Sequence, residues 1–193
     1  MSNLPVLDKK QFLKVVNARP PKYLKPEQIH AIISNAQKDR YKTLFLLLWS
    51  TGARISEALA LKVEDVDWGM KQIRFITEKR RGKAERLVPV GTELLGQLAT
   101  YIQTAKLGSQ DRLFKMTPVA VHKELKLICR KAGLPGWIHA HTFRHSFAIN
   151  CLTQGVTINT VKELMGHANV ETTMIYLKIF QPDIKEQLSR VTF

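Results

Sequence analysis

Hydrophobic residues follow a helical period along most of this chain, and one short region breaks that period. Residues 71–76 and 86–90 alternate polar and apolar side chains, which is typical of half-buried β-strands. The segment between them, residues 77–85, is rich in charge and contains a glycine. We therefore predict a β-hairpin with an exposed basic tip, and residues 63–66 are a candidate third strand.

The rest of the pattern is helical. A helix is expected to begin at Pro26, because proline suits a first helical position. A second helix over about 39–50, nearly all apolar in its later half, should lie in the core. A short helix is expected from residue 54 or 55 to residue 61. Further helices are predicted over residues 92–105, 118–132, 142–154, 157–165, 170–179 and 182–190. The predicted fold class is mainly α with a small antiparallel β-sheet (α+β).

A length of 193 residues and a 45% share of apolar residues suit one domain with a real core. We predict a basic N-terminal arm or linker remnant over residues 1–22, with a short helix near residues 8–16. A Pro-Pro pair ends this segment because it cannot continue a helix. The main domain is expected over residues 23–180, followed by a C-terminal helix or tail over residues 181–193. The start of the chain has no apolar stretch of the signal-peptide type, so residence in the cytoplasm is the expectation.

Net charge gives the first indication of function. Thirty Lys and Arg against sixteen Asp and Glu give a formal charge of +14, and a field of that size attracts polyanions such as nucleic acid. A basic protein without a nucleic-acid role is the alternative, and a membrane surface is less well supported because no long helix has a concentrated basic face. Cys129 and Cys151 have no metal-site spacing, so we expect buried free thiols and no metal.

Five polar side chains stand in apolar settings: Arg54, His141, Arg144, His167 and Tyr176. Each has an ordinary explanation, such as an ion pair of Arg54 with Glu57 or a packing role for the tyrosine. Together they form a set suited to phosphoryl transfer without a metal. Arginines bind phosphodiester oxygens in a bidentate manner, and a tyrosine hydroxyl attacks phosphorus when a neighbour accepts its proton.

Three blocks of the chain resemble motifs of the tyrosine recombinases and phage-type integrases, in the family's order and spacing. Residues 51–59 (TGARISEAL) are similar to the first-arginine motif, and residues 141–148 (HTFRHSFA) to the HxxR motif. Residues 164–167 (LMGH), followed by residues 172–176 (TTMIY), are similar to the late histidine and tyrosine motif. The resemblance covers nearly all of residues 23–180 and implies the catalytic-domain fold of that family.

The resemblance implies a role for each matched residue. Arg54 and Arg144 would hold the scissile phosphate, and His141 would accept and return the proton of the attacking hydroxyl. His167 would hydrogen-bond a phosphate oxygen. Tyr176 would form a 3′-phosphotyrosine and release a 5′-hydroxyl. The two histidines that flank the HxxR motif, at positions 139 and 145, are expected to be structural.

Glu57 resembles the acidic neighbour of the first arginine and is expected to orient it. The family also carries a hairpin lysine that protonates the leaving group. Lys79 matches best when counted forward from the first arginine, and Lys83 is the alternative; counted back from the second strand, Arg81 falls at that place. Three hairpin arginines are expected to bind DNA, mainly at its phosphates: Arg80, Arg81 and Arg86.

The sequence thus predicts a site-specific DNA recombinase that acts through a phosphotyrosine intermediate and a Holliday junction, with no cofactor. A type IB topoisomerase-like relaxing enzyme and an inactive DNA-binding regulator are the alternatives. The expected partners are double-stranded DNA, further copies in a synaptic tetramer held through residues 181–193, and accessory proteins, with the protein located on the nucleoid. Most integrases have a helical domain before the catalytic one, and about 22 residues precede it here. We expect either a shortened chain or a naturally short, invertase-like member.

Overall fold

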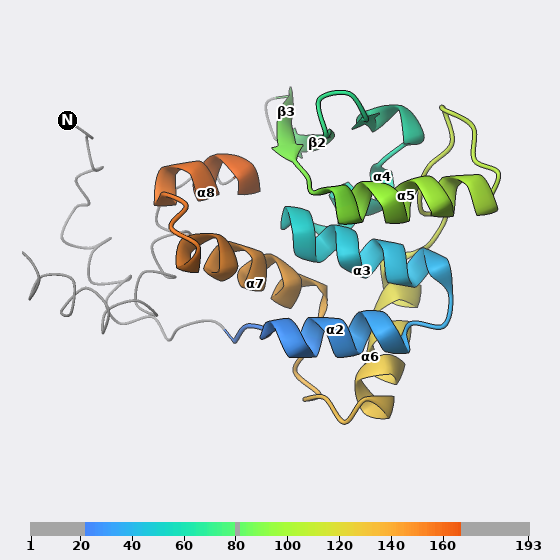
Figure 1. Ribbon diagram of the computed structural model, residues 1–193, viewed down its shortest axis with the longest axis vertical. Helices are drawn as coiled ribbons and strands as arrows, with labels where there is room; N and C mark the ends of the chain where they lie inside the picture. The colour runs from blue at the N-terminus through green and yellow to red at the C-terminus, as the bar shows by residue number, and fades with distance from the viewer. Residues whose placement is uncertain (1–21, 80–81, 167–193) are drawn as a thin grey trace, which may run out of the picture. The chain divides into compact units, whose positions relative to one another are not determined.

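The computed structural model describes residues 22–79 and 82–166 (Figure 1). The helices expected near residues 8–16, 170–179 and 182–190 lie outside these residues. The chain divides into two compact units, of which the larger is Tyr23–Phe147 and the smaller contains residues 148–166 among those described. The domain boundaries drawn from the sequence at residues 22 and 180 stay predictions.

Helices account for most of the larger unit, as predicted. They are α2 (Pro26–Asn35), α3 (Asp39–Thr51), α4 (Ile55–Ala60), α5 (Thr92–Thr104) and α6 (Pro118–Lys131). A sixth helix, α7 (Ala140–Thr153), begins in this unit and continues into the smaller one. The start at Pro26 confirms the expectation from proline at a first helical position.

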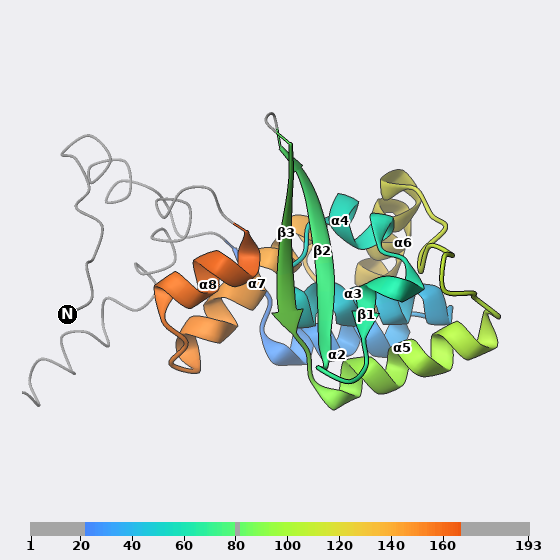
Figure 2. The same ribbon diagram turned by 90° about the horizontal axis from the view of Figure 1, so that it is seen from above.

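The sheet has three antiparallel strands in the order β1-β2-β3. They are β1 (Val66–Asp67), β2 (Gln72–Lys79) and β3 (Gly82–Pro89). The predicted hairpin is confirmed, but its strands continue through the charged segment that the sequence suggested for the tip, because the register pairs residue 79 with residue 82. Figure 2 shows the far ends of β2 and β3 projecting beyond α3 and α5.

The candidate strand over residues 63–66 was largely wrong. Val63–Asp65 forms a 3-10 turn (η1), and pairing with β2 begins at Val66. The reason is local: the Asp65 carboxylate accepts the backbone N–H of Lys62 at 2.9 Å. Such side-chain bonds to nearby backbone compete with strand pairing and favour a tight turn.

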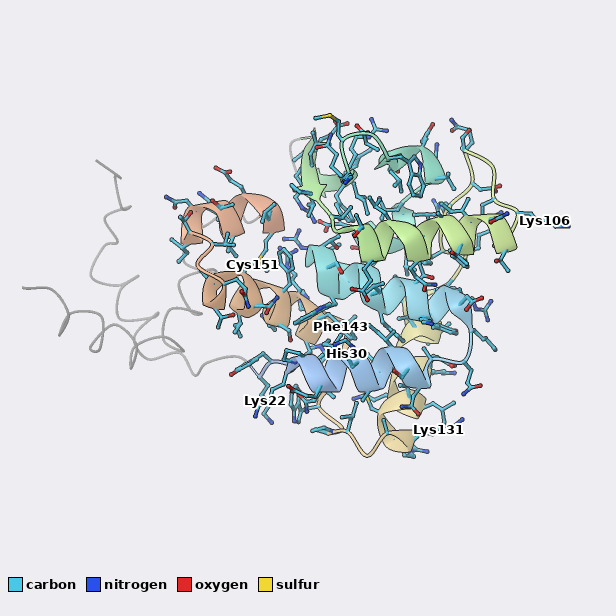
Figure 3. All side chains as sticks on the ribbon, in the orientation of Figure 1. Lys22, His30, Lys106, Lys131, Phe143 and Cys151 are labelled. Atoms are coloured by element: carbon cyan, nitrogen blue, oxygen red, sulfur yellow. The ribbon has the colours of Figure 1, made fainter. Side chains whose placement is uncertain are left out.

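The core is centred on α3, whose later half is almost wholly apolar. Its Leu44, Phe45 and Leu47 are fully buried, and α3 lies beside α2 and α5 (Figure 1). The ring of Phe143, from the first turn of α7, stacks on Phe45 with 5.6 Å between centroids. Figure 3 shows Phe143 inside the unit near α2, whereas charged side chains such as Lys106 lie at the periphery. The burial of these two rings therefore packs the first turn of α7 against α3.

The hairpin has one buried and one exposed face. Ile73, Phe75 and Val88 are almost fully buried, whereas Ile76 and Leu87 on the opposite face are exposed. This alternation follows from the period of two along a strand. Strand β2 also packs near α4, so the inner face of the hairpin is the face that the short helix after Gly52 adjoins.

In the smaller unit, α8 (Ile158–Met165) begins at a Thr157 cap, whose hydroxyl oxygen accepts the N–H of Thr160. It ends at Gly166 in the left-handed conformation, as expected for a glycine after a helix.

Both cysteines are free thiols: Cys151 on α7 is half-buried and Cys129 on α6 is buried. Burial raises the pKa of each thiol. In the described part of the chain, helices are too short or too polar to cross a membrane.

Candidate active site

The site begins where α3 ends, at Gly52. This residue has a φ of 61°, and its N–H donates to the Leu48 carbonyl at 3.0 Å. A Cβ placed on it would lie 2.4 Å from Cδ1 of Phe147. Glycine is therefore required both by the left-handed backbone and by the close approach of the ring. The turn brings Arg54 to the position that precedes the first residue of α4.

Glu57 holds Arg54 at two points. Its Oε1 accepts a hydrogen bond from Nη1 of Arg54 at 2.8 Å, and its Oε2 accepts the backbone N–H of Arg54 at 2.9 Å. The glutamate side chain is only 4% exposed, whereas that of Arg54 is 33% exposed. The ion pair uses one of the five N–H donors of the guanidinium, so the exposed part is suited to a bound anion. The pairing that seemed an ordinary explanation of Arg54 is thus compatible with a functional one.

A second arginine reaches the same carboxylate from the hairpin. Nη2 of Arg86 donates to Oε2 of Glu57 at 2.7 Å, and the Arg86 guanidinium lies 4.8 Å from the ring centre of Phe75, its cross-strand neighbour. The Arg86 side chain is 9% exposed. We call Arg54, Glu57 and Arg86 the Glu57 cluster; its formal charges sum to +1.

Arg144 comes to this place from α7. It is 3% exposed, and its Nη1 donates to the carbonyl oxygen of Gly52 at 2.7 Å. The helix is fixed nearby by Ser146, whose hydroxyl donates to the Thr142 carbonyl and accepts the N–H of Leu24, each at 2.7 Å. Arg144 is therefore seated on a residue two positions before Arg54, and the two predicted phosphate ligands share one short segment.

His141 and Arg54 line one pocket of about 370 Å³. Its wall includes apolar side chains from α6, Val121 and Leu125, together with His139. Burial lowers the pKa of His141 below its ordinary value of 6.5, and positive charge at Arg144, His139 and Arg54 adds to the shift. A neutral imidazole near pH 7 has a nitrogen able to accept a proton. The pocket thus joins a proton acceptor to an anion-binding group.

His145 lies one helical turn after His141, and their ring centroids are 5.7 Å apart. Burial lowers the pKa of His145 to about 4, with further contributions from positive charge at His141, His139 and Arg144. It therefore stays neutral beside the pocket at physiological pH. This setting agrees with the structural role expected for His145.

The remaining predicted site residues are placed less completely. Lys79 is the last residue of β2 and pairs with Gly82, and Lys83 is the second residue of β3. Four others lie outside the described residues: Arg80, Arg81, His167 and Tyr176. The structure therefore brings together Arg54, Glu57, His141 and Arg144, and the roles inferred for the whole set stay predictions. Within residues 22–79 and 82–166, no group of His, Cys, Asp or Glu is arranged to hold a metal ion.

Sequence reasoning missed two contacts of the site. Arg86 was expected to bind DNA, but its guanidinium is engaged with Glu57. The signal that indicates this is the strand period: Arg86 precedes the buried Val88 by two positions, so both side chains belong to the same face. The bond from Arg144 to the Gly52 carbonyl has no comparable signal, because a backbone acceptor leaves no mark on residue type.

The fold of this chain resembles that of solved recombinases. The crystal structure of XerA recombinase superposes with a TM-score of 0.78 at 26% identity, covering 91% of this chain and 66% of that one. The structure of XerH site-specific recombinase bound to difH substrate in a pre-cleavage complex gives a TM-score of 0.73 at 24% identity, covering 90% and 55%. The predicted catalytic-domain fold is thereby confirmed.

Residues 22–181 match the phage integrase family, and the chain belongs to that family. Among its relatives is the tyrosine recombinase XerA of Pyrococcus horikoshii, which is 34% identical over 178 residues. That alignment covers 88% of this chain and 61% of the relative, so the chain spans less than two thirds of the length of the recombinase it matches.

Proposed function

We propose that this chain is the catalytic part of a site-specific DNA recombinase that cleaves and rejoins strands through a phosphotyrosine at Tyr176. The observation that carries the proposal is the convergence of two arginines and a neutral histidine on the Gly52–Arg54 segment. Arg144 binds the Gly52 carbonyl, and Arg54 shares a pocket with His141. Membership of the phage integrase family supports the same chemistry.

The arrangement suits a phosphodiester in both charge and geometry. The Glu57 cluster has a formal charge of +1 and Arg144 adds another, so a bound phosphate is neutralised and its transition state gains hydrogen bonds. In cleavage, the phenol oxygen of Tyr176 bonds to phosphorus while its proton passes to His141. The bond from phosphorus to the 5′ oxygen breaks, and that oxygen takes a proton from a hairpin lysine, for which we propose Lys79 with Lys83 as alternative. His167 is proposed to bind a phosphate oxygen.

Double-stranded DNA is the proposed partner. The formal charge of +14 favours a polyanion, and the XerH recombinase with a similar fold is bound to its DNA substrate. Exchange between two duplexes requires several copies of the enzyme, so we also propose self-association on DNA. Residues 181–193, proposed to mediate it, lie outside the described residues.

Covalent capture tests this function. The full chain is incubated with a pool of duplexes that have randomised central sequences and a nick, so that the short 5′-hydroxyl fragment released by cleavage diffuses away. We expect a denaturant-stable protein–DNA adduct that maps to Tyr176, and sequencing of the captured DNA gives the preferred site. Tyr176→Phe is expected to bind DNA without forming the adduct. An adduct of normal yield in that variant contradicts the nucleophile assignment.

Joining of strands from two different duplexes separates a recombinase from a relaxing enzyme. The captured sequence is placed on two labelled linear duplexes of different length, and the products are separated by size. We expect recombinant lengths. Relaxation of supercoiled plasmid without any recombinant product favours the topoisomerase-like alternative, and DNA binding without either reaction favours an inactive regulator.

A further inference from the structure

Arg86 stands out among the charged residues of the hairpin because its side chain is turned into the molecule. It is 9% exposed, whereas Arg74, which is on the neighbouring strand, is 41% exposed. The two residues belong to opposite faces, since Arg86 pairs with the fully buried Phe75 and Arg74 pairs with the exposed Leu87. A side chain buried to this degree offers little surface to a DNA backbone.

The contacts of Arg86 converge on the carboxylate that orients Arg54. Oε2 of Glu57 accepts both Nη2 of Arg86 at 2.7 Å and the backbone N–H of Arg54 at 2.9 Å. The second oxygen, Oε1, accepts the Arg54 guanidinium. With one oxygen occupied by Arg86 from the hairpin side, the other is directed to Arg54, and the rotation of the carboxylate is restricted. The stack on Phe75 fixes the plane of the Arg86 guanidinium in turn.

Charge explains why a second arginine is needed. A carboxylate with one guanidinium is neutral, so without Arg86 the Arg54–Glu57 pair would offer a phosphate no net positive charge and Arg144 alone would supply it. Arg86 adds a second positive charge to this pair through the other carboxylate oxygen, Oε2. Glu57 can then hold Arg54 without weakening its attraction for an anion.

From these contacts we propose that Arg86 is a positioning residue, which acts through Glu57 to fix the orientation of the Arg54 guanidinium and makes no contact with DNA. The proposal rests on the function proposed above. It revises the expectation that Arg86 binds the DNA backbone and assigns a task to the base of the hairpin, separate from that of its tip.

The first test compares Arg86→Gln with Arg74→Gln in the full chain, using the duplex recovered by covalent capture. For Arg86→Gln we expect the single-turnover rate of adduct formation at saturating DNA to fall by about 10- to 100-fold, as for a misplaced catalytic group. The dissociation constant for DNA should stay within about twofold, and the slope of log affinity against log salt should not change. Arg74→Gln, which removes an arginine from an ion pair in the same sheet, should keep the wild-type rate.

A DNA contact at Arg86 gives the opposite pattern. Affinity then falls, the salt slope decreases by about one, and the saturating rate stays at the wild-type value. That result overturns the proposal, as does a variant with unchanged rate and affinity. Arg86→Lys retains the charge but loses the planar fork, so its rate should lie between those of wild type and Arg86→Gln. If Arg86→Gln does not fold, a wild-type rate in Arg86→Lys counts against the proposal.

A second readout does not depend on catalysis. In protein with ¹⁵N-labelled arginine, nuclear magnetic resonance follows the rotation of the Arg54 guanidinium, with Arg54→Lys used to assign its signals. We expect slow rotation in wild type and in Arg74→Gln, and faster rotation in Arg86→Gln. If wild type forms no adduct, the proposed function fails while this measurement still decides the positioning role. Equal rotation in all three proteins overturns the role even if the adduct forms.

Discussion

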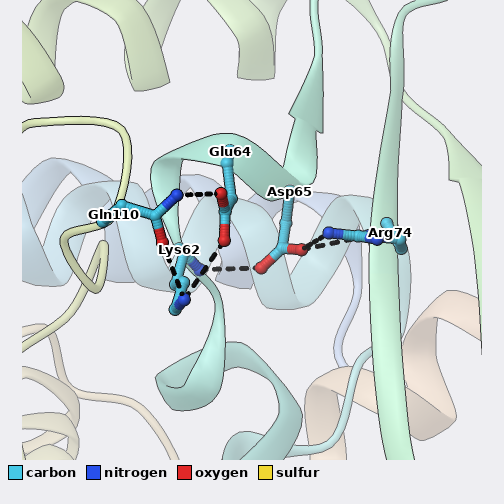
Figure 4. Close-up of polar contacts among 5 residues, drawn as sticks. All are labelled: Lys62, Glu64, Asp65, Arg74 and Gln110. Carbon is cyan, nitrogen blue, oxygen red and sulfur yellow. Dashed lines mark hydrogen bonds and ion pairs between the residues drawn. The ribbon is translucent and has the colours of Figure 1, made fainter.

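Two carboxylates of the larger unit accept the same pattern of hydrogen bonds, but one lies at the candidate site and the other beside surface ion pairs. Glu57 and Asp65 each accept the backbone N–H of the residue three positions earlier, and each receives an arginine from the sheet. We call Lys62, Asp65 and Arg74 the Asp65 cluster; Figure 4 shows it with its neighbours Glu64 and Gln110. The Asp65 cluster lies beside further surface ion pairs, whereas the Glu57 cluster adjoins the pocket that contains His141.

The difference lies in the number of guanidiniums on each carboxylate. Oδ1 of Asp65 accepts both hydrogen bonds from Arg74, and Oδ2 accepts the backbone N–H of Lys62. Glu57 divides its oxygens between two arginines, one buried and one partly exposed. A capped turn thus becomes part of a site when a second cation compensates the carboxylate. The comparison shows that an ion pair at a turn says little about function until the number of guanidiniums bound to its carboxylate is known.

The largest effect is expected at the backbone on which the site is built. Gly52→Ala adds a methyl group that overlaps the Phe147 ring at a positive φ, and the two costs together amount to about 4 kcal/mol of unfolding free energy. Denaturant unfolding measures the loss. Gly96→Ala is the matched control, because Gly96 is an exposed residue of α5 with open space at its Cβ, and it should be slightly stabilising. Equal effects at the two glycines would contradict the assigned role of Gly52.

Glu57→Ala is expected to have the next largest effect. It leaves two guanidiniums without their carboxylate, and we expect a loss of about 3 kcal/mol, the lower end for a broken buried pair because Arg54 is partly exposed. Asp65→Ala should cost about 1.5 kcal/mol, since it removes hydrogen bonds to one charged group and one amide. Chemical denaturation of both variants checks the order. A larger cost at Asp65 than at Glu57 would break the comparison.

Acidification should separate the site from the surface around the Asp65 cluster. In the folded protein the pKa of His145 is lowered from 6.5 to about 4, so the unfolded state binds more protons between these values. Stability is therefore complete above pH 6.5 and decreases as the pH falls toward 4, by about 2 kcal/mol after allowance for partial exposure. Unfolding at a series of pH values measures this slope, and His145→Gln should flatten it.

Carboxylates near the other cluster titrate in a different window. Hydrogen bonds from Lys62 and Lys115 lower the pKa of Glu64 and Asp111 below their ordinary values of 4.5 and 3.8. Any stability that these groups add is present above those values and is lost at lower pH. A wild-type slope that begins only below pH 4.5 would mean that the histidines beside the pocket contribute nothing to it.

The smallest effect is expected for Arg74→Gln. The side chain is 41% exposed, and solvent screens exposed ion pairs so that they contribute little to stability. The cost should shrink further as salt is added, which thermal unfolding at low and high ionic strength measures. A salt-independent loss as large as that of Glu57→Ala would show that the two sheet arginines are equivalent, contrary to the comparison.

Periodicity predicted the elements of the fold because each of them buries one face. The run of apolar residues in α3 and the alternation in β2 and β3 appear directly as burial in the structure. The turn at Val63–Asp65 was misread because a side-chain bond to backbone decided it, and composition alone does not reveal that competition. Local pattern therefore predicts elements well and their irregular connections poorly.

The site was predictable to the extent that its chemistry depends on residue type. Arg54, His141 and Arg144 were found from motif and spacing, and the structure places all three around one segment. The partner of Arg86 was not found, because a basic residue on a hairpin suggests DNA unless its strand face is considered. The hydrogen bond from Arg144 to the Gly52 carbonyl could not be predicted, because every residue supplies a backbone carbonyl.

The hairpin meets the site at the rung that pairs Phe75 with Arg86, whereas the described ladder continues four residues further, to Lys79 and Gly82. That separation corresponds to about 13 Å along a strand. Residues gained or lost beyond the Phe75–Arg86 pair would change the length of the hairpin without disturbing the contact of Arg86 with Glu57. Insertion between Gly52 and Arg54 has no such freedom, since it would part the two guanidiniums. Changes in length are thus tolerable at one end of the hairpin and excluded at the turn that its base supports.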